Sequence, residues 1–222
     1  MIERFRARLS FFHVTLAVLV VTGFAMRIWG NRFGLPFLYH EDEGEIVRRA
    51  LRMPVDGPNP GWFQYPTLYV YVQSAVYAAL WAVGRLTGSA LSYSQFADAA
   101  TLDPSAVYAV GRTVTASFGA ATIAVTGAAG RWLVSLDARG RDIAGLAAAA
   151  LVTIELLEVE HAHYITADVP MTLAATCVLL AVARLAAAPE GVSIRGYAIA
   201  GLLGGLAASI KYPGALFAVA PL

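Results

Sequence analysis

Apolar residues in this chain come in long blocks that shorter polar stretches separate. The blocks run for about 16 to 25 residues, a length suited to helices that cross a hydrocarbon core about 30 Å thick. The pattern predicts an all-α, polytopic membrane protein that forms one transmembrane domain over residues 1–222, with no soluble domain. The predicted spans cover about residues 9–29, 106–134, 143–159, 169–187 and 196–210, and another begins at 215–222.

The first long polar stretch, residues 30–65, is the predicted loop after the first span. From Asp42 to Met53, apolar residues recur at helical spacing and charged residues occupy the opposite face. This pattern predicts an amphipathic helix on the membrane surface. The prolines between residues 54 and 60 are expected to end that helix. Residues 66–86 are apolar but rich in Tyr and Trp, so this segment is interfacial, re-entrant or spanning.

The basic residues decide between these topologies. The N-terminal arginines predict a cytoplasmic N-terminus, because positive charge is enriched in cytoplasmic loops. If residues 66–86 cross the membrane, the basic loops at 131–141 and 184–195 fall outside, against this rule. If the segment lies on the surface or returns, both loops are cytoplasmic. We favour the second arrangement, which places the loop at 30–65 and the loop at 161–168 together on the extracytoplasmic side.

Composition supports a membrane environment. The chain is 58% hydrophobic and 14% charged, whereas soluble domains carry about 25% charged residues. A net charge of +1, with no basic run beyond the N-terminal arginines, excludes nucleic acid as a partner. The single cysteine, Cys177, lies within an apolar block, which is typical of a packing role. The expected partner is the lipid bilayer, in a bacterial-type inner or plasma membrane.

Ionisable residues near the outer ends of the predicted spans are the candidates for a functional site, because such groups are costly at membrane level. A carboxylate there can act as a general base, and a second carboxylate with histidine can hold a divalent metal ion. Arg and Lys can bind a phosphate, so the set suits an anionic lipid head group. The candidates are Asp42, Glu43, Arg112, His161, His163, Asp168 and Lys211.

Each candidate also has a purely structural interpretation. The acids at 41–43 can cap the surface helix, and Asp168 before Pro170 can begin another helix. Arg112 can extend to the interface or form a structural ion pair. The His161 and His163 pair is a weak metal pattern, and Lys211 can anchor its helix at the interface. These alternatives stay open from the residues alone.

Five short motifs in a fixed order resemble the N-terminal membrane half of GT-C glycosyltransferases of the dolichyl-phosphate-mannose protein mannosyltransferase and aminoarabinose transferase type. The resemblance covers almost all 222 residues. The motifs are, in chain order, Asp42-Glu43, Phe63-Gln64-Tyr65-Pro66-Thr67-Leu68, Gly111-Arg112-Thr113-Val114 with Gly119, His161-Ala162-His163-Tyr164-Ile165-Thr166-Ala167-Asp168-Val169-Pro170, and Ser209-Ile210-Lys211-Tyr212.

The resemblance implies a GT-C-like helix bundle that transfers a sugar from a polyprenyl-phosphate donor to an acceptor on the extracytoplasmic face, with inversion at the sugar. It implies that Asp42, beside Glu43, activates the acceptor, and that Asp168 is the second acid of the site, which in some family members is associated with a metal ion. By the same resemblance, Arg112 and Lys211 face the lipid phosphate. A divalent metal ion is the one cofactor that this comparison indicates.

Two departures from the family pattern define an alternative. Family members often carry a lysine where this chain has Tyr65-Pro66-Thr67, and they continue through further spans. An enzyme is therefore expected if the chain is part of a longer protein. The alternative is a non-catalytic transmembrane subunit, built on a shortened scaffold of this type and packed against neighbouring membrane subunits.

Overall fold

The computed structural model describes residues 11–37, 39–187 and 194–219, and over these ranges the chain is helical with no strand. The all-α prediction is therefore confirmed for the described residues. The N-terminal arginines and residues 220–222 of the last predicted block lie outside them. The helices are α1 (Phe11–Ile28), α2 (Glu41–Asp56), α3 (Leu68–Leu86), α4 (Tyr93–Leu102), α5 (Ser105–Trp132), α6 (Ala138–Ile154), α7 (Leu156–His161), α8 (Asp168–Ala186), α9 (Ile194–Ile210) and the 3₁₀ helix η2 (Tyr212–Val219).

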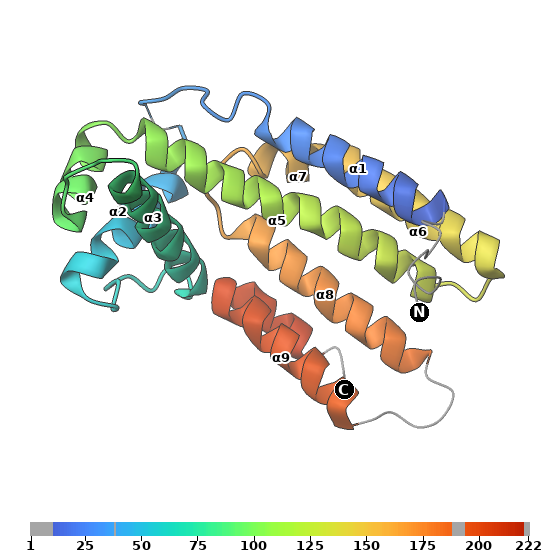
Figure 1. Cartoon of the computed structure of the whole chain (residues 1–222). Helices are drawn as coiled ribbons and strands as arrows, with labels where there is room; N and C mark the ends of the chain where they lie inside the picture. The colour runs from blue at the N-terminus through green and yellow to red at the C-terminus, as the bar shows by residue number, and fades with distance from the viewer. Residues whose placement is uncertain (1–10, 38, 188–193, 220–222) are drawn as a thin grey trace, which may run out of the picture.

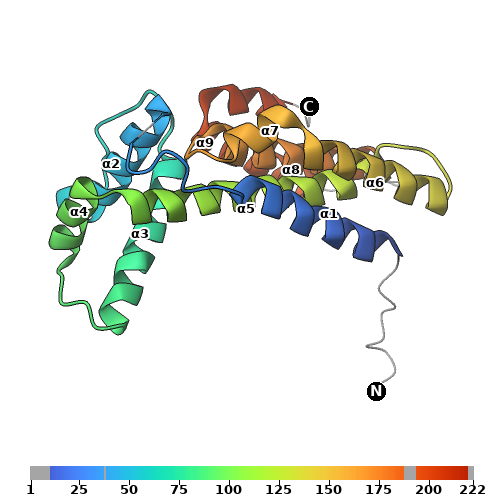
Figure 2. The same ribbon diagram turned by 90° about the horizontal axis from the view of Figure 1, so that it is seen from above.

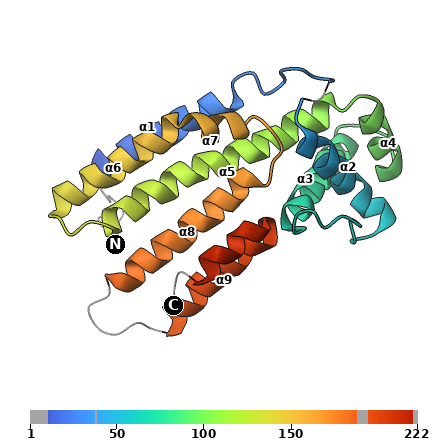
Figure 3. The same cartoon turned by 180° about the vertical axis from the view of Figure 1, so that it is seen from behind.

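Most of these helices form a bundle around α5. Helices α1 and α6 pack on one side of α5 and on each other, α8 packs on the other side, and α9 packs on α8 (Figures 1 and 3). The chain reverses after α9, so that η2 lies against that helix. Three described helices, α1, α5 and α8, are long and apolar enough to cross a membrane, and α9 is a shorter apolar helix. These lengths and compositions indicate a membrane protein.

Close packing of α5 on α6 depends on a glycine of α6. A Cβ on Gly145 would lie 2.5 Å from the carbonyl oxygen of Gly127, closer than any ordinary contact. Small residues of this kind let helix backbones approach in lipid, where packing rather than hydrophobic burial drives association. By contrast, a Cβ on Gly201, on the exposed face of α9, would meet nothing within 4 Å.

We expect Gly145→Ala to destabilise the protein by about 1 to 3 kcal/mol, because the added methyl group forces α5 and α6 apart. The matched change Gly201→Ala adds the same methyl group in open space and should leave stability unchanged or slightly raised. Thermal unfolding of both variants in detergent micelles measures the difference. Equal unfolding temperatures for the two variants would contradict the close α5–α6 contact.

Helices α2, α3 and α4 form a separate layer at one end of the bundle. Figure 2 shows α3 running across the direction of α5 rather than along it. The predicted helix from Asp42 to Met53 is confirmed as α2, and its apolar residues Ile46, Val47 and Ala50 are buried against protein. Much of the apolar face of α2 therefore packs on α3 and α4. The apolar face of a free surface helix would contact lipid instead.

The predicted span at 143–159 is wrong in one respect. The helix ends at Ile154, and a new short helix begins after Glu155, whose carboxylate accepts hydrogen bonds from the backbone N–H groups of Leu157 (3.2 Å) and Glu158 (2.6 Å). Arg27 donates to the last carbonyls of α6, those of Val152 (2.8 Å) and Thr153 (3.2 Å). A helix end normally leaves such carbonyls unsatisfied, so the buried Arg27 stabilises the break.

Candidate functional site

Four polar side chains from four separate segments meet where the α2–α4 layer joins the bundle. Lys211 Nζ lies 2.6 Å from Asp168 Oδ1 and 5.1 Å from the centre of the Tyr65 ring. The Tyr65 hydroxyl lies 3.3 Å from each carboxylate oxygen of Asp42. We call Asp42, Tyr65, Asp168 and Lys211 the Asp42 cluster. It brings together three residues that the sequence singles out.

Local structure explains where each member of the cluster lies. Asp168 is the first residue of α8, where an acid is favoured by the helix dipole, and Lys211 directly follows α9, where a cation is favoured. Tyr65 comes just before α3. All four side chains are partly exposed, so a ligand can reach them.

Asp42 is not the cap of its helix. The N-cap residue is His40, whose Nδ1 accepts a hydrogen bond of 3.3 Å from the backbone N–H of Asp42. The Asp42 carboxylate is therefore free to accept from Tyr65 instead. Burial raises the pKa of the Tyr65 phenol, and the negative charge of Asp42 raises it further, so the hydroxyl stays protonated and donates to that carboxylate.

Glu43 and Arg112 lie beside the cluster but do not face a ligand. Both side chains are fully buried, and Arg112 donates to both carboxylate oxygens of Glu43, at 2.8 and 2.7 Å. Glu43 also accepts from the backbone N–H of Ile165 at 2.9 Å. Arg112 further donates to the carbonyls of Asn31 (2.9 Å) and Phe33 (3.0 Å). The pair thus joins α2, α5 and two loops.

This arrangement corrects two predicted roles. A buried Arg112 whose donors face protein acceptors does not contact a lipid phosphate, and a buried Glu43 held by Arg112 does not contact an acceptor. The structural alternative for Arg112, an ion pair, is the one observed. A buried charge without a partner of opposite sign destabilises the folded protein, so buried charges such as Arg112 and Glu43 occur in pairs.

The two predicted histidines, His161 and His163, lie in different surroundings. His163 places Nδ1 2.7 Å from the carbonyl of Val159 and Nε2 3.1 Å from that of Trp29, so neither ring nitrogen is free to bind a metal. Asp168 is engaged by Lys211. Within the described ranges, no three His, Cys, Asp or Glu side chains are placed as metal ligands. The metal ion therefore stays a prediction, and no chemical step is assigned to one.

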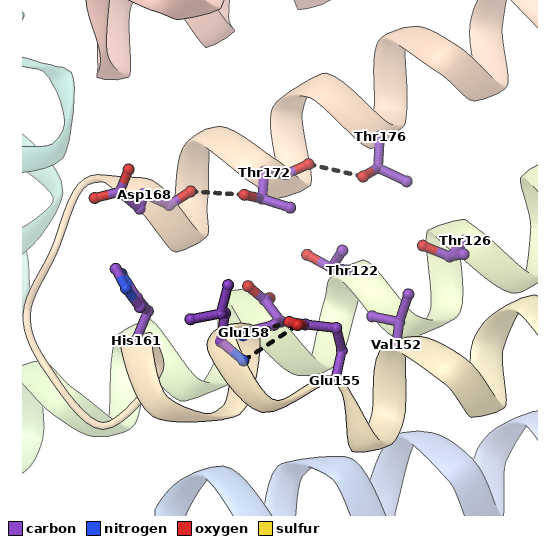
Figure 4. A pocket seen from close by; sticks show the side chains of 10 residues that line it. Thr122, Thr126, Val152, Glu155, Glu158, His161, Asp168, Thr172 and Thr176 are labelled. Atoms are coloured by element: carbon purple, nitrogen blue, oxygen red, sulfur yellow. Dashed lines mark hydrogen bonds between the residues drawn. The ribbon is translucent and has the colours of Figure 1, made fainter.

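His161 and Asp168 lie at one end of a cavity of about 420 Å³ between α5, α7 and α8, which several polar side chains line although most of its surface is apolar (Figure 4). We call it the threonine cavity, because Thr122 and Thr126 of α5 face Thr172 and Thr176 of α8 across it. Its remaining walls come from the end of α6 and from α7, including the two acids Glu155 and Glu158.

Glu158 is the most perturbed acid of this cavity. It lies in α7, beyond the end of α6 and outside the three candidate spans. Burial raises the pKa of the Glu158 carboxyl to about 7, while the positive charge of Arg27 opposes the shift. Arg27 and Glu158 are both ionisable groups within or at the end of an apolar block, and this is the sequence signal that marks them.

A second hollow, on the opposite side of α8, is almost wholly apolar. This apolar groove of about 250 Å³ lies between α3, α5, α8 and α9. It includes Leu68, Pro170 and Ile210, which lie within three residues of Tyr65, Asp168 and Lys211 in the sequence. The remaining lining residues include Phe118, Leu173, Cys177, Leu203 and Leu206.

The structure therefore joins Asp42, Asp168 and Lys211 in one cluster, together with Tyr65, which belongs to one of the five motifs but is not among the predicted site residues. It places Glu43 and Arg112 in a structural ion pair, His161 on the threonine cavity and His163 in backbone contacts. No protein-family model, no curated protein and no solved structure matches the chain.

Proposed function

We propose that this chain carries the acceptor- and donor-binding site of a membrane glycosyltransferase that uses a polyprenyl-phosphate-linked sugar. The observation that carries the proposal is the Asp42 cluster, which holds a carboxylate and an ammonium group and whose sequence neighbours Pro170 and Ile210 line the apolar groove. A base, a cation and an apolar groove are the three features that an amphiphilic phosphate donor and a hydroxyl acceptor require.

Lys211 binds the phosphate in this proposal. Its ammonium group has three donors, and Asp168 takes one of them at 2.6 Å. The other donors are available to phosphate oxygens, for which a lysine acts as a compact positive charge. Arg112, which the family resemblance assigns to the phosphate, takes no part, because Glu43 and two carbonyls hold it.

The apolar groove takes the first part of the isoprenoid chain. Two residues that line the groove are close to the cluster in sequence. Pro170 lies two residues after Asp168, and Ile210 directly precedes Lys211. A lipid whose phosphate lies at Lys211 therefore meets apolar surface on α8 and α9. Burial of isoprenoid carbons there adds favourable transfer free energy to the phosphate contact.

Asp42 is the proposed general base. It takes the proton of the acceptor hydroxyl, and the acceptor oxygen bonds to the anomeric carbon as the bond between that carbon and the phosphate oxygen breaks. The bonding electron pair leaves with that oxygen, where Lys211 stabilises the negative charge. The products are the glycosylated acceptor, with inverted configuration, and polyprenyl phosphate. The proton on Asp42 is then lost to water.

The proposal predicts that Lys211→Ala in the full-length gene product raises KM for polyprenyl-phosphate-mannose by about 10- to 100-fold, since a hydrogen bond to a charged group is lost. Initial rates of sugar transfer in native membranes, which supply the acceptor, measure this change. Lys211→Arg keeps the charge and should lose much less. An unchanged KM in the alanine variant would contradict phosphate binding by Lys211.

A further inference from the structure

Tyr65 touches both the proposed base and the proposed phosphate-binding cation. Its hydroxyl lies 3.3 Å from each carboxylate oxygen of Asp42, and Lys211 Nζ lies over the face of its ring, 5.1 Å from the ring centre. Asp42 belongs to the first turn of α2, whereas Lys211 directly follows α9. One aromatic side chain therefore joins two functional groups that come from distant parts of the sequence.

The hydroxyl of Tyr65 holds the Asp42 carboxylate. In the described ranges, no other side chain or backbone N–H group donates a hydrogen bond to that carboxylate. His40 contacts the backbone N–H of Asp42 and not its side chain. Each carboxylate oxygen has a second lone pair, so the acceptor hydroxyl can bind while the contact with Tyr65 is kept. Without that contact, the carboxylate is free to turn about its side-chain bonds.

The ring of Tyr65 contacts the ammonium group of Lys211 on a side that Asp168 does not occupy. Asp168 accepts from Nζ at 2.6 Å and draws the ammonium group into an ion pair. A donor phosphate has to compete with this carboxylate for the same cation. The negative face of an aromatic ring attracts the cation as well, which keeps it from moving closer to Asp168. The two contacts together fix where the positive charge lies.

The position of the Tyr65 ring is itself supported by its neighbours. Pro66 follows Tyr65, and a residue before proline is restricted to extended backbone conformations. Trp62 packs edge-on against the ring, with ring centres 5.4 Å apart and an angle of 87° between the planes. The helix that follows, α3, is anchored by the buried Tyr69 and Tyr77. Tyr65 is thus held in place by backbone, by packing and by an anchored helix.

Tyr65 is a hydrogen-bond donor in this site and not a second base. Burial raises the pKa of its phenol, and the negative charges of Asp42 and Asp168 raise it further. The phenol therefore keeps its proton at neutral pH and cannot take the proton of the acceptor. That step stays with Asp42, and Tyr65 acts on the reaction only through the groups that it holds.

We propose that Tyr65 is a positioning residue, whose hydroxyl directs the Asp42 carboxylate toward the acceptor and whose ring directs the Lys211 ammonium group toward the donor phosphate. This inference rests on the proposed function, since Tyr65 acts through the base and the cation that the function assigns. The two roles belong to different parts of one side chain. Loss of the hydroxyl should lower kcat, whereas loss of the ring should also raise KM for the donor.

Two substitutions in the full-length gene product separate these roles. Tyr65→Phe keeps the ring, so kcat should fall by about 10-fold, because a misplaced reacting group slows the chemical step, while KM for polyprenyl-phosphate-mannose stays within twofold. Tyr65→Leu removes the ring as well and should also raise KM by about 3- to 10-fold, as expected for loss of a cation–π contact. Initial rates of sugar transfer in native membranes give both constants.

Tyr71→Phe is the matched control. Tyr71 lies on α3, and its hydroxyl donates to the carbonyl of Pro58 at 3.1 Å, away from the Asp42 cluster. The substitution removes the same hydroxyl group as Tyr65→Phe and should leave kcat and KM within twofold. A fall in kcat equal to that of Tyr65→Phe would indicate a general effect of such losses near α3 and would overturn the inference.

A double variant tests whether Tyr65 acts through Asp42. In a protein that carries Asp42→Asn, Tyr65→Phe should cause no further fall in kcat, because the base that it positions is already absent. A further 10-fold fall would overturn the inference, as would an unchanged kcat in Tyr65→Phe alone or equal KM values in the Phe and Leu variants. The proposed function still stands in these cases if Asp42→Asn and Lys211→Ala lower transfer. If neither of those two does, the proposed function fails and this inference fails with it.

Discussion

Asp42→Asn in the full-length gene product is expected to lower the rate constant of sugar transfer by about 10²- to 10⁴-fold, the range associated with loss of a general base. Asn has nearly the same shape as Asp, and its amide oxygen can still accept from the Tyr65 hydroxyl, so the cluster should keep its geometry. The amide cannot take the proton of the acceptor. Turnover of polyprenyl-phosphate-mannose in native membranes measures the loss, with KM for the donor expected to change little.

Glu41 provides the matched control. It lies next to Asp42 in the first turn of α2, but its side chain is exposed to solvent. Glu41→Gln removes one negative charge from the same helix turn and should leave transfer within about twofold, because a surface charge contributes little. Equal losses in the two variants would indicate a general effect of charge on α2 and would contradict a specific role for Asp42.

Arg112→Met is expected to lower the free energy of unfolding by about 3 to 5 kcal/mol, because it leaves Glu43 charged, buried and without its partner. It also removes the donors that satisfy the carbonyls of Asn31 and Phe33. For a chain of this size the loss corresponds to a fall in unfolding temperature on the order of 10 °C. Thermal unfolding in detergent micelles provides the measurement.

Arg48→Met is the matched control for this prediction, since Arg48 pairs with Glu45 on the exposed side of the same layer. Its loss should cost less than about 1 kcal/mol. The double variant Arg112→Met with Glu43→Leu should recover part of the stability lost in the single variant, because no unpaired charge is left buried. A fall in unfolding temperature as small as that of Arg48→Met would contradict the buried pair.

The predicted helices agree with the structure where apolar periodicity is long and uninterrupted. The spans predicted at 106–134 and 169–187 correspond to α5 and α8 within one or two residues. Apolar periodicity does not predict the break at Glu155, because Leu, Val and Ile continue on both sides of it and only the acids within the block signal the change. One side chain that stabilises that break, Arg27, lies 125 residues away from Val152, and periodicity cannot reveal such a contact.

The site was predictable in its residues but not in its pairings. Asp42, Asp168 and Lys211 stand out as ionisable groups at span ends, and the structure places them together. The sequence does not indicate that Glu43 rather than Asp42 meets Arg112, because neighbouring residues on a helix face different directions. Similarly, the cap of α2 is His40, and this leaves the Asp42 carboxylate available.

The most direct test of a sugar-transfer site at the Asp42 cluster is phosphorus NMR of polyprenyl-phosphate-mannose in native membranes that contain the full-length protein. The account predicts that the phosphodiester signal is replaced by the phosphomonoester signal of polyprenyl phosphate, at a rate that the Asp42→Asn variant lowers by about 10²-fold or more. Conversion at the same rate in both proteins, or no conversion beyond that of membranes lacking the protein, would contradict it.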